Sequence, residues 1–217
     1  MTPAEIAEAA SLTEAWKARD ECQDLVRDDW RYMDTYEEQV AGWDLMGLAS
    51  YNWDGLDSGH FIDQNRAVPA CREAAEAFSQ DARILFRYGK PLEDKHPQES
   101  ARIYIDGAKM GHASAQARLS LAYTRGKGVP RDLTEAARWL REAADQGHSA
   151  AAFELARRYR HGTGVMQDYI EAYRWFTVAA ILGRRSAQEY RQKLVSHMTP
   201  EEVEWAERLA QKWEPRS

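Results

Sequence analysis

Apolar and small residues recur at helical spacing between residues 113 and 183, and the pattern repeats itself after an offset of 36 residues, from Gly111 to Gly147. The same shift carries Gly147 onto Gly183, and the two copies align without a gap. Self-similarity at a period of roughly 20 to 50 residues is typical of stacked repeats, in which a single unit has no core of its own. The pattern therefore predicts an all-α array of repeats.

Each copy predicts two helices. In the first copy, the first helix covers residues 113–123, where the apolar positions share one helical face, and it ends at the glycines of the sequence RGKGVP. The second helix starts after an aspartate, Asp132 or Asp168, that is followed three residues later by a glutamate, and this arrangement resembles a capping box. Trp139 and Trp175 occupy the same repeat position, so we expect both to be buried between neighbouring repeats.

The two copies resemble the Sel-1-like repeat, a relative of the tetratricopeptide repeat with a longer, glycine-bearing loop. Their sequences are SAQARLSLAYTRGKGVPRDLTEAARWLREAADQGH and SAAAFELARRYRHGTGVMQDYIEAYRWFTVAAILGR. The resemblance implies a right-handed α-solenoid with a concave groove used for protein–protein contacts, often in adaptors for signalling or membrane-associated assembly. It brings no shared catalytic residues, so we expect a binding protein rather than an enzyme.

The rest of the chain divides around these repeats. Residues 1–50 predict an N-terminal region of two or three helices, and residues 51–112 predict degenerate units of the tetratricopeptide or Sel-1-like type. The two well-formed repeats take residues 113–184, and residues 185–217 predict C-terminal helices that cap the array.

Local signals refine this division. Thr2 and Thr199 each open a T-P-x-E sequence, which places proline at the first position of a helix, where its missing N–H is tolerated. Residues 51–61 are rich in turn formers and predict a loop, whereas residues 62–78 predict a second helix of a repeat. The loop expected over residues 89–99 resembles a tetratricopeptide turn.

The chain has two cysteines, too few for a disulfide framework or a cysteine zinc site. Residues 62–78 also resemble a segment of bacterial Sel-1-like proteins that has one cysteine near each helix. Cys71 matches one of these cysteines, but Trp43 stands where the other is expected. The resemblance therefore argues against a structural disulfide, and it leaves the redox state of Cys22 and Cys71 open.

Charge is distributed unevenly along the chain. Residues 1–60 contain 14 acidic and 4 basic side chains, whereas residues 101–193 contain 9 acidic and 16 basic ones. Because first helices line the concave side of arrays of this type, cations on them are candidates for binding an acidic protein or peptide segment. The alternative is that these cations only form a solvated face. The concave positions that we expect to be exposed and to contact a partner are Arg118, Arg157, Arg158 and Arg191.

Several classes of partner are disfavoured. The net charge of −6 and the absence of a basic stripe interleaved with aromatic residues argue against nucleic-acid binding. No apolar run approaches the roughly 18 residues of a membrane span. The N-terminal sequence MTPAEIAEAASLTEAW lacks the basic and apolar regions of a signal peptide. We therefore expect a cytoplasmic protein, or a periplasmic or secreted one if the chain has been trimmed.

Two other functions remain open. The acidic N-terminal helices could pack on the basic repeats of a second copy, which would make the chain a self-assembling repeat protein. Asp54, Asp57 and His60 lie in one loop and could form a metal-binding or enzymatic centre, although this triplet is a weak signal. His112 and His148 occupy the same position after a glycine, and we expect them to cap helices rather than to catalyse a reaction. No cofactor is predicted.

Overall fold

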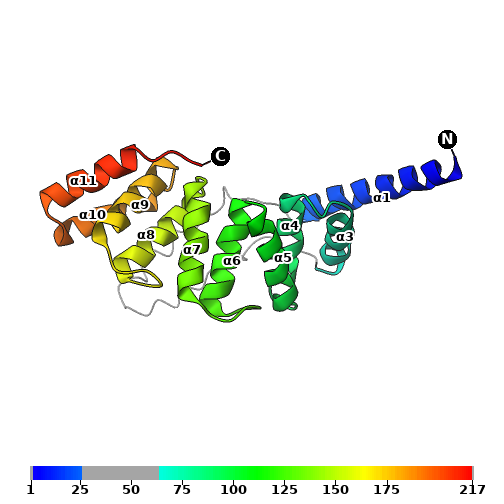
Figure 1. Cartoon of the computed structure of the whole chain (residues 1–217), viewed down its shortest axis with the longest axis horizontal. Helices are drawn as coiled ribbons and strands as arrows, with labels where there is room; N and C mark the ends of the chain where they lie inside the picture. The colour runs from blue at the N-terminus through cyan, green and yellow to red at the C-terminus, as the bar shows by residue number, and fades with distance from the viewer. Residues whose placement is uncertain (1, 26–63, 217) are drawn as a thin grey trace.

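The structure is a computed structural model that describes residues 2–25 and 64–216. These residues form ten α-helices and one short 3₁₀ helix, with no β-strand among them. The helices stack along one axis into an elongated α-solenoid, from whose N-terminal end helix α1 projects (Figure 1). In chain order they are α1 (Pro3–Leu25), α3 (Gln64–Ala77), α4 (Ala82–Leu92), α5 (Pro97–Lys109), α6 (Ala113–Arg125), α7 (Leu133–Asp145), α8 (Ser149–His161), α9 (Tyr169–Ile181), α10 (Ser186–Leu194), the 3₁₀ helix Val195–His197 and α11 (Pro200–Gln211).

The first helix of each repeat ends at a glycine in the left-handed conformation. Gly126 follows α6 with a φ of 71°, and Gly162 follows α8 with a φ of 69°. Glycine adopts this backbone conformation without the steric strain of a side chain. The first predicted helix is therefore confirmed, and it continues beyond residue 123 to Arg125.

The second glycine of each loop allows close contact between repeats. A Cβ atom at Gly128 would overlap the carbonyl oxygen of Pro97, and one at Gly164 would overlap that of Leu133. Pro97 and Leu133 are each the first residue of the second helix in the preceding unit. Each loop therefore rests directly on the preceding repeat, and any larger residue at these glycines would force the two apart.

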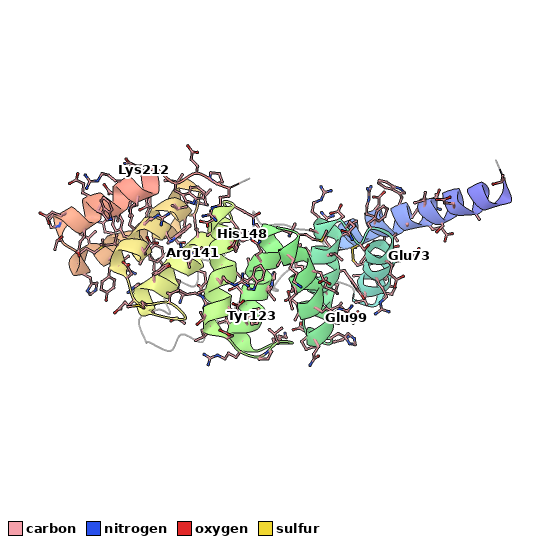
Figure 2. All side chains as sticks on the ribbon, viewed as in Figure 1. Glu73, Glu99, Tyr123, Arg141, His148 and Lys212 are labelled. Carbon is pink, nitrogen blue, oxygen red and sulfur yellow. A yellow bond between two sulfur atoms is a disulfide. The ribbon has the colours of Figure 1, made fainter. Side chains whose placement is uncertain are left out.

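The predicted N-caps of the second helices are confirmed. The carboxylate of Asp132 accepts hydrogen bonds from the amides of Thr134 and Glu135 at 2.9 and 3.0 Å, and Asp168 caps α9 in the same way. The amide of Asp132 donates to the carbonyl oxygen of Tyr123 at 3.0 Å. Tyr123 is labelled in Figure 2, near the end of α6 that leads into this loop. The cap thus also ties the second helix to the first.

The two repeat tryptophans are not equivalent. Trp175 is fully buried, and its indole N–H donates to the Glu171 carboxylate at 3.1 Å. Trp139 is only half-buried, and the guanidinium of Arg138 lies 4.2 Å from the centre of its ring. The prediction of equal burial is wrong because α9 packs against α8, α10 and α11, whereas α7 packs against α6 and α8.

A disulfide joins α1 to α3. Cys22 and Cys71 are bonded to each other, and both side chains are buried. The expectation of no structural disulfide is therefore wrong. It rested on finding Trp43 in place of the second cysteine, but α1 supplies that cysteine instead. Trp43 lies outside the described residues.

The N-terminal predictions are tested only in part. Helix α1 begins at Pro3, as the T-P-x-E sequence predicts, and runs as one helix to Leu25. The helix predicted over residues 62–78 corresponds to α3. The helices expected in residues 26–50 and the loop over residues 51–61 lie outside the described residues.

The loop predicted over residues 89–99 is much shorter in the structure. Helix α4 continues through Gly89 to Leu92, and α5 already begins at Pro97. The hydroxyl of Ser100 donates to the carbonyl oxygen of Gly89 at 2.8 Å, and a Cβ atom at Gly89 would overlap the ring of Tyr104. These contacts with α5 keep Gly89 inside α4, a tertiary effect that overrides the usual weakening of a helix by glycine.

Helix α11 follows the last helix pair and starts at a complete capping box. Thr199 and Glu202 form a complete capping box at the start of α11, with the Glu202 carboxylate accepting from the Thr199 amide at 2.8 Å. Ala206 and Ala210 form the buried face of α11, which packs against α9. The predicted T-P-x-E helix start is thus confirmed at this end as well.

Candidate interaction surface

Arg118 is the predicted contact residue that lies at a pocket. It extends from α6 toward the end of α4, where its Nη1 atom lies 3.4 Å from a carboxylate oxygen of Glu93. One face of the side chain remains open to solvent, with 20% of its surface exposed. Arg118 is therefore held in a fixed position and can still be reached by a ligand.

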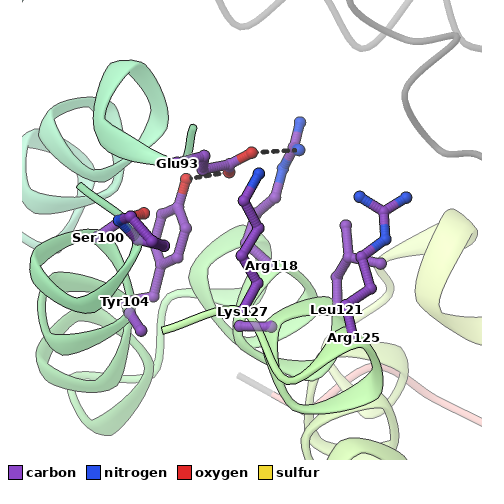
Figure 3. Close-up of a pocket in the computed structure, with 10 residues that line it drawn as sticks. Glu93, Ser100, Tyr104, Arg118, Leu121, Arg125 and Lys127 are labelled. Atoms are coloured by element: carbon purple, nitrogen blue, oxygen red, sulfur yellow. Dashed lines mark hydrogen bonds and ion pairs between the residues drawn. The ribbon is translucent and has the colours of Figure 1, made fainter. Parts of the chain in front are cut away.

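The pocket lies between α5, α6 and the loop that follows α6 (Figure 3). Its volume is about 30 Å³, enough for one or two water molecules or part of a side chain. Three cationic side chains line it, one in α6, one at the end of α6 and one in the following loop. The lining residues are Glu93, Pro97, Ser100, Ala101, Tyr104, Arg118, Leu121, Ala122, Arg125 and Lys127. We call this site the basic pocket.

Glu93 is held inside the basic pocket from two sides. The hydroxyl of Tyr104 donates to one of its carboxylate oxygens at 2.5 Å, while Arg118 faces the other (Figure 3). Burial raises the pKa of Tyr104 well above its ordinary value, and the nearby Glu93 carboxylate raises it further. The tyrosine therefore remains a proton donor at neutral pH, and both its hydroxyl and the Arg118 guanidinium are directed at the Glu93 carboxylate.

The mouth of the basic pocket is more weakly neutralised. Lys127 forms an ion pair with Asp94 at 2.6 Å, in which the two side chains are 37% and 65% exposed. Such exposed pairs contribute only about 0 to 1 kcal/mol, so a ligand can replace one partner at little cost. Arg125 is exposed at the end of α6 beside the same mouth.

Arg158 is not a surface residue. Only 3% of it is exposed, and its guanidinium donates to the hydroxyl of Thr124 and to the carbonyl oxygen of Leu133. Burial lowers the pKa of Arg158, although the neighbouring Glu154 carboxylate opposes this effect. The expectation that Arg158 is exposed on the concave side is therefore wrong: its side chain links α8 to the preceding repeat.

Arg157 and Arg191 lie apart from the basic pocket. Arg157 is mostly covered and forms an ion pair with Glu154 at 3.1 Å. The guanidinium of Arg191 lies 5.5 Å from the ring centre of Tyr173, whose hydroxyl donates to Glu207 at 2.9 Å. The structure thus does not bring the four predicted arginines into one site.

Glu93 and Tyr104 are pocket residues that the sequence pattern did not indicate. Both lie in the degenerate unit before the first clear repeat, and Glu93 falls in the stretch predicted to be a loop. A signal does exist for Arg158, because under the repeat offset it falls on Ala122 of the first copy. Ala122 shares a helical face with Leu119 in the predicted first helix, so an arginine at the equivalent position is expected to face the array rather than solvent.

The two histidines act as helix caps, as expected. The Nδ1 atom of His112 accepts a hydrogen bond from the Ala115 amide at 3.2 Å, and that of His148 accepts from the Ala151 amide at 3.1 Å. His148, labelled in Figure 2, lies near the end of the repeat opposite Tyr123. Burial lowers its pKa to about 4, with smaller contributions from Arg118 and His112.

Within residues 2–25 and 64–216, no group of three or more histidine, cysteine, aspartate or glutamate side chains could hold a metal ion. Asp54, Asp57 and His60, the weak metal candidate, lie outside the described residues. None of the helices that the structure describes combines the length and apolar character needed to cross a bilayer.

Comparisons with known proteins agree with the helix pairs described above. The family model described as "Sel1 repeat" matches twice, over residues 113–148 and 149–183. No curated protein is similar enough to match the chain. Members of this repeat family typically mediate protein–protein interactions.

Two solved structures share this fold. A protective antigen of uropathogenic Escherichia coli that displays an SLR fold is 30% identical, with a TM-score of 0.65 over 71% of this chain and 34% of the antigen. A Sel1 repeat protein from Oxalobacter formigenes is 26% identical, with a TM-score of 0.52 over 59% of this chain and 58% of the other. The present chain thus spans about a third of the antigen's length. Residues 113–183 are two Sel1 repeats, and they form the centre of an α-solenoid of the bacterial Sel1 type.

Proposed function

We propose that this protein is an interaction module that binds an acidic side chain of a partner protein at the basic pocket. The observation that carries this proposal is the convergence of Arg118, Arg125 and Lys127 on one pocket at the start of the Sel1 repeats. The typical role of the repeat family supports a protein partner rather than a small substrate.

The internal carboxylate of Glu93 occupies the inner donors of the basic pocket. Glu93 accepts from the Tyr104 hydroxyl and pairs with Arg118. A partner carboxylate is therefore expected at the mouth, where Arg125 and Lys127 also line the pocket. Hydrogen bonds between ionised partners are stronger than neutral ones. A partner carboxylate at the mouth would meet Arg125 and Lys127, and at Lys127 it would compete with the exposed Asp94.

A fluorescent hexaglutamate peptide is a defined probe for this proposal. We expect it to bind the full chain and to weaken with added salt, because exposed charges are screened over about 8 Å at physiological ionic strength. The double variant Arg125→Glu/Lys127→Glu should bind at least about tenfold more weakly, as expected when close charge contacts become repulsive.

The matched control reverses two cations elsewhere. Arg102 and Lys109 are both exposed on α5 and do not line the basic pocket, so Arg102→Glu/Lys109→Glu makes the same change in net charge. This control should retain most of the binding. Equal losses in the two double variants would mean that the probe senses only total charge, and the proposal would be abandoned.

Self-association is a second candidate function, and helix α1 favours it. Leu12 and Trp16 of α1 are 51% and 47% exposed, and the helix projects from the array (Figure 1). Residues 2–25 are acidic overall, whereas the repeats are basic. We expect a self-associating chain to show a concentration-dependent mass in light scattering that Leu12→Lys reduces. A monomeric mass at all concentrations would exclude this candidate.

The disulfide suggests where the protein works. Structural disulfides persist mainly in oxidising compartments, such as the periplasm and the extracellular space, and are rare in the cytosol. We therefore propose an extracytoplasmic location, in place of the cytoplasmic one expected from the sequence. Thiol labelling after rapid acid quenching of cells should leave Cys22 and Cys71 unlabelled until a reductant is added. Labelling without a reductant would contradict this location.

A further inference from the structure

The last described residues of the chain fold back onto the turn between α7 and α8. After α11 ends, residues 213–216 return toward α7, and the C-terminal end lies beside that helix (Figure 1). The backbone amide of Arg216 donates to the carbonyl oxygen of Asp145 at 2.7 Å, and its guanidinium lies 3.2 Å from the Asp145 carboxylate. We call residues 213–216 the tail segment.

The two Asp145 contacts have the character of peptide recognition. Asp145 is the last residue of α7, where the carbonyl oxygens lack partners within the helix and the helix dipole favours a cation. The Asp145 side chain is only 12% exposed. A cation that pairs with it is therefore attracted more strongly than it would be by a fully solvated carboxylate. Arg216 thus binds Asp145 through both its main chain and its side chain.

The tail segment also fills an apolar surface beside this pair. A Cβ atom at Gly147 would lie 3.6 Å from Pro215 and 3.9 Å from the ring of Trp213. Trp213 packs against the core cluster of α8, α9 and α11. The occupant of this turn is therefore an extended segment with an aromatic anchor, a proline over the glycine and an arginine on the acid.

Only one of the three equivalent turns has these features. The turns at Gly111 and Gly183 have the same left-handed glycine as Gly147, yet a Cβ atom there would meet nothing within 4 Å. Under the repeat offset, the position of Asp145 is held by Lys109 in one of these turns and by Ile181 in the other. Of these three turns, only residues 145–147 combine an acidic side chain, Asp145, with a glycine that the tail segment covers, Gly147.

We propose that the α7–α8 turn, residues 145–147, is a binding site for an extended basic segment in which arginine directly follows proline. The tail segment is its tethered occupant, and a segment of the same chemistry from a partner protein displaces it. This site lies at the opposite end of the repeat from the loop of the basic pocket, since α6 and α7 run antiparallel between them. It takes a basic ligand, so it is independent of the function proposed above.

The contact within one chain is tested by amide hydrogen exchange on the full-length protein. We expect the Arg216 amide to exchange at least about tenfold more slowly than in an unstructured peptide, because it is bonded to Asp145. Asp145→Lys should remove this protection, whereas Asp106→Lys, the same change at an exposed aspartate of α5, should keep it. An unprotected amide in the parent, or equal protection in the two variants, would overturn the proposal.

Binding of a separate segment is tested with a labelled peptide of sequence KWEPRS, which copies residues 212–217. A tethered ligand competes at an effective concentration near the millimolar range, so the variant Arg216→Glu should bind the peptide at least about tenfold more tightly than the parent does. Adding Asp145→Ala, which removes the acid without a new charge for the substituted glutamate to pair with, should abolish this binding, and a peptide with glutamine in place of arginine should not bind.

The outcomes separate the two sites. Binding of KWEPRS should be unchanged in Arg125→Glu/Lys127→Glu, because those cations line the basic pocket and not the α7–α8 turn. Peptide binding that survives Asp145→Ala would overturn the proposed site. So would equal affinity for the parent and the Arg216→Glu variant, or no binding to that variant up to millimolar peptide.

Discussion

The imidazole of His148 accepts a hydrogen bond from the amide of Ala151, and this bond requires an unprotonated Nδ1 atom. A protonated ring would point an N–H at the amide and lose the cap. Burial, together with Arg118 and His112, lowers the pKa of His148 to about 4. Helix α8 thus depends on the neutral form of one side chain.

This dependence predicts acid-sensitive stability. Below its ordinary pKa of about 6.5 the unfolded chain binds a proton at His148, whereas the folded chain does not until about pH 4. The contribution of neutral His148 to the free energy of unfolding is therefore fully present above pH 6.5. It decreases as the pH drops from 6.5 to 4, by roughly 3 kcal/mol at most. Urea unfolding at several pH values measures this loss. The variant His148→Asn, which can still cap the helix, should lose less stability in acid than the parent. The variant His197→Asn, on the surface, should lose as much as the parent.

The glycine contacts between repeats predict a large difference between two similar substitutions. Gly164 and Gly183 both have positive φ angles, but a Cβ atom meets the Leu133 carbonyl only at Gly164. Gly183→Ala should cost only the strain of a left-handed backbone, about 1 to 2 kcal/mol. Gly164→Ala should cost clearly more, because a repeat must also move. Equal shifts in the melting temperature would contradict this packing.

The unequal burial of the two tryptophans predicts unequal effects. Trp175→Ala removes a fully buried ring and should destabilise the protein by about 3 to 5 kcal/mol. Trp139→Ala removes a half-buried ring that lies under Arg138, and its cost should be clearly smaller. Denaturant midpoints of the two variants give the comparison. Similar losses would indicate that the repeats pack equivalently in solution.

The disulfide predicts that a reductant lowers stability. Cys22 and Cys71 are 49 residues apart, and closing a loop of this size restricts the unfolded chain by an amount worth about 2 to 4 kcal/mol. Thermal unfolding with and without dithiothreitol should show this loss. The variant Cys22→Ser/Cys71→Ser should match the reduced parent and should not respond to the reductant. A reductant effect that persists in this variant would point to another cause.

The fold could be predicted largely because the repeat pattern encodes local structure. The αL glycines, the aspartate caps and the T-P-x-E start at Thr199 each act through their own backbone neighbourhood, so the sequence alone reveals them. The same applies to the His148 cap, which its glycine-flanked position indicated.

The candidate site could be predicted only in part because it depends on contacts between repeats. Arg118 was expected at the surface, but its partner Glu93 lies 25 residues earlier in a unit without a clear pattern. Arg157 and Arg158 are adjacent in sequence and equally charged, yet one faces Glu154 and the other enters the interface with Thr124. Charge alone does not distinguish these two environments; the position of each residue around the helix does.

The close approach of Gly128 to Pro97, and of Gly164 to Leu133, also bears on the mechanics of the array. Each contact sets a steric limit on how closely consecutive helix pairs can approach, because the glycine backbone lies directly against a backbone carbonyl group of the preceding repeat. Flattening or tightening the superhelix would require these loops to slide or separate. These two contacts therefore oppose changes in the spacing of consecutive helix pairs, so a partner that lies across several repeats meets an array that they stiffen.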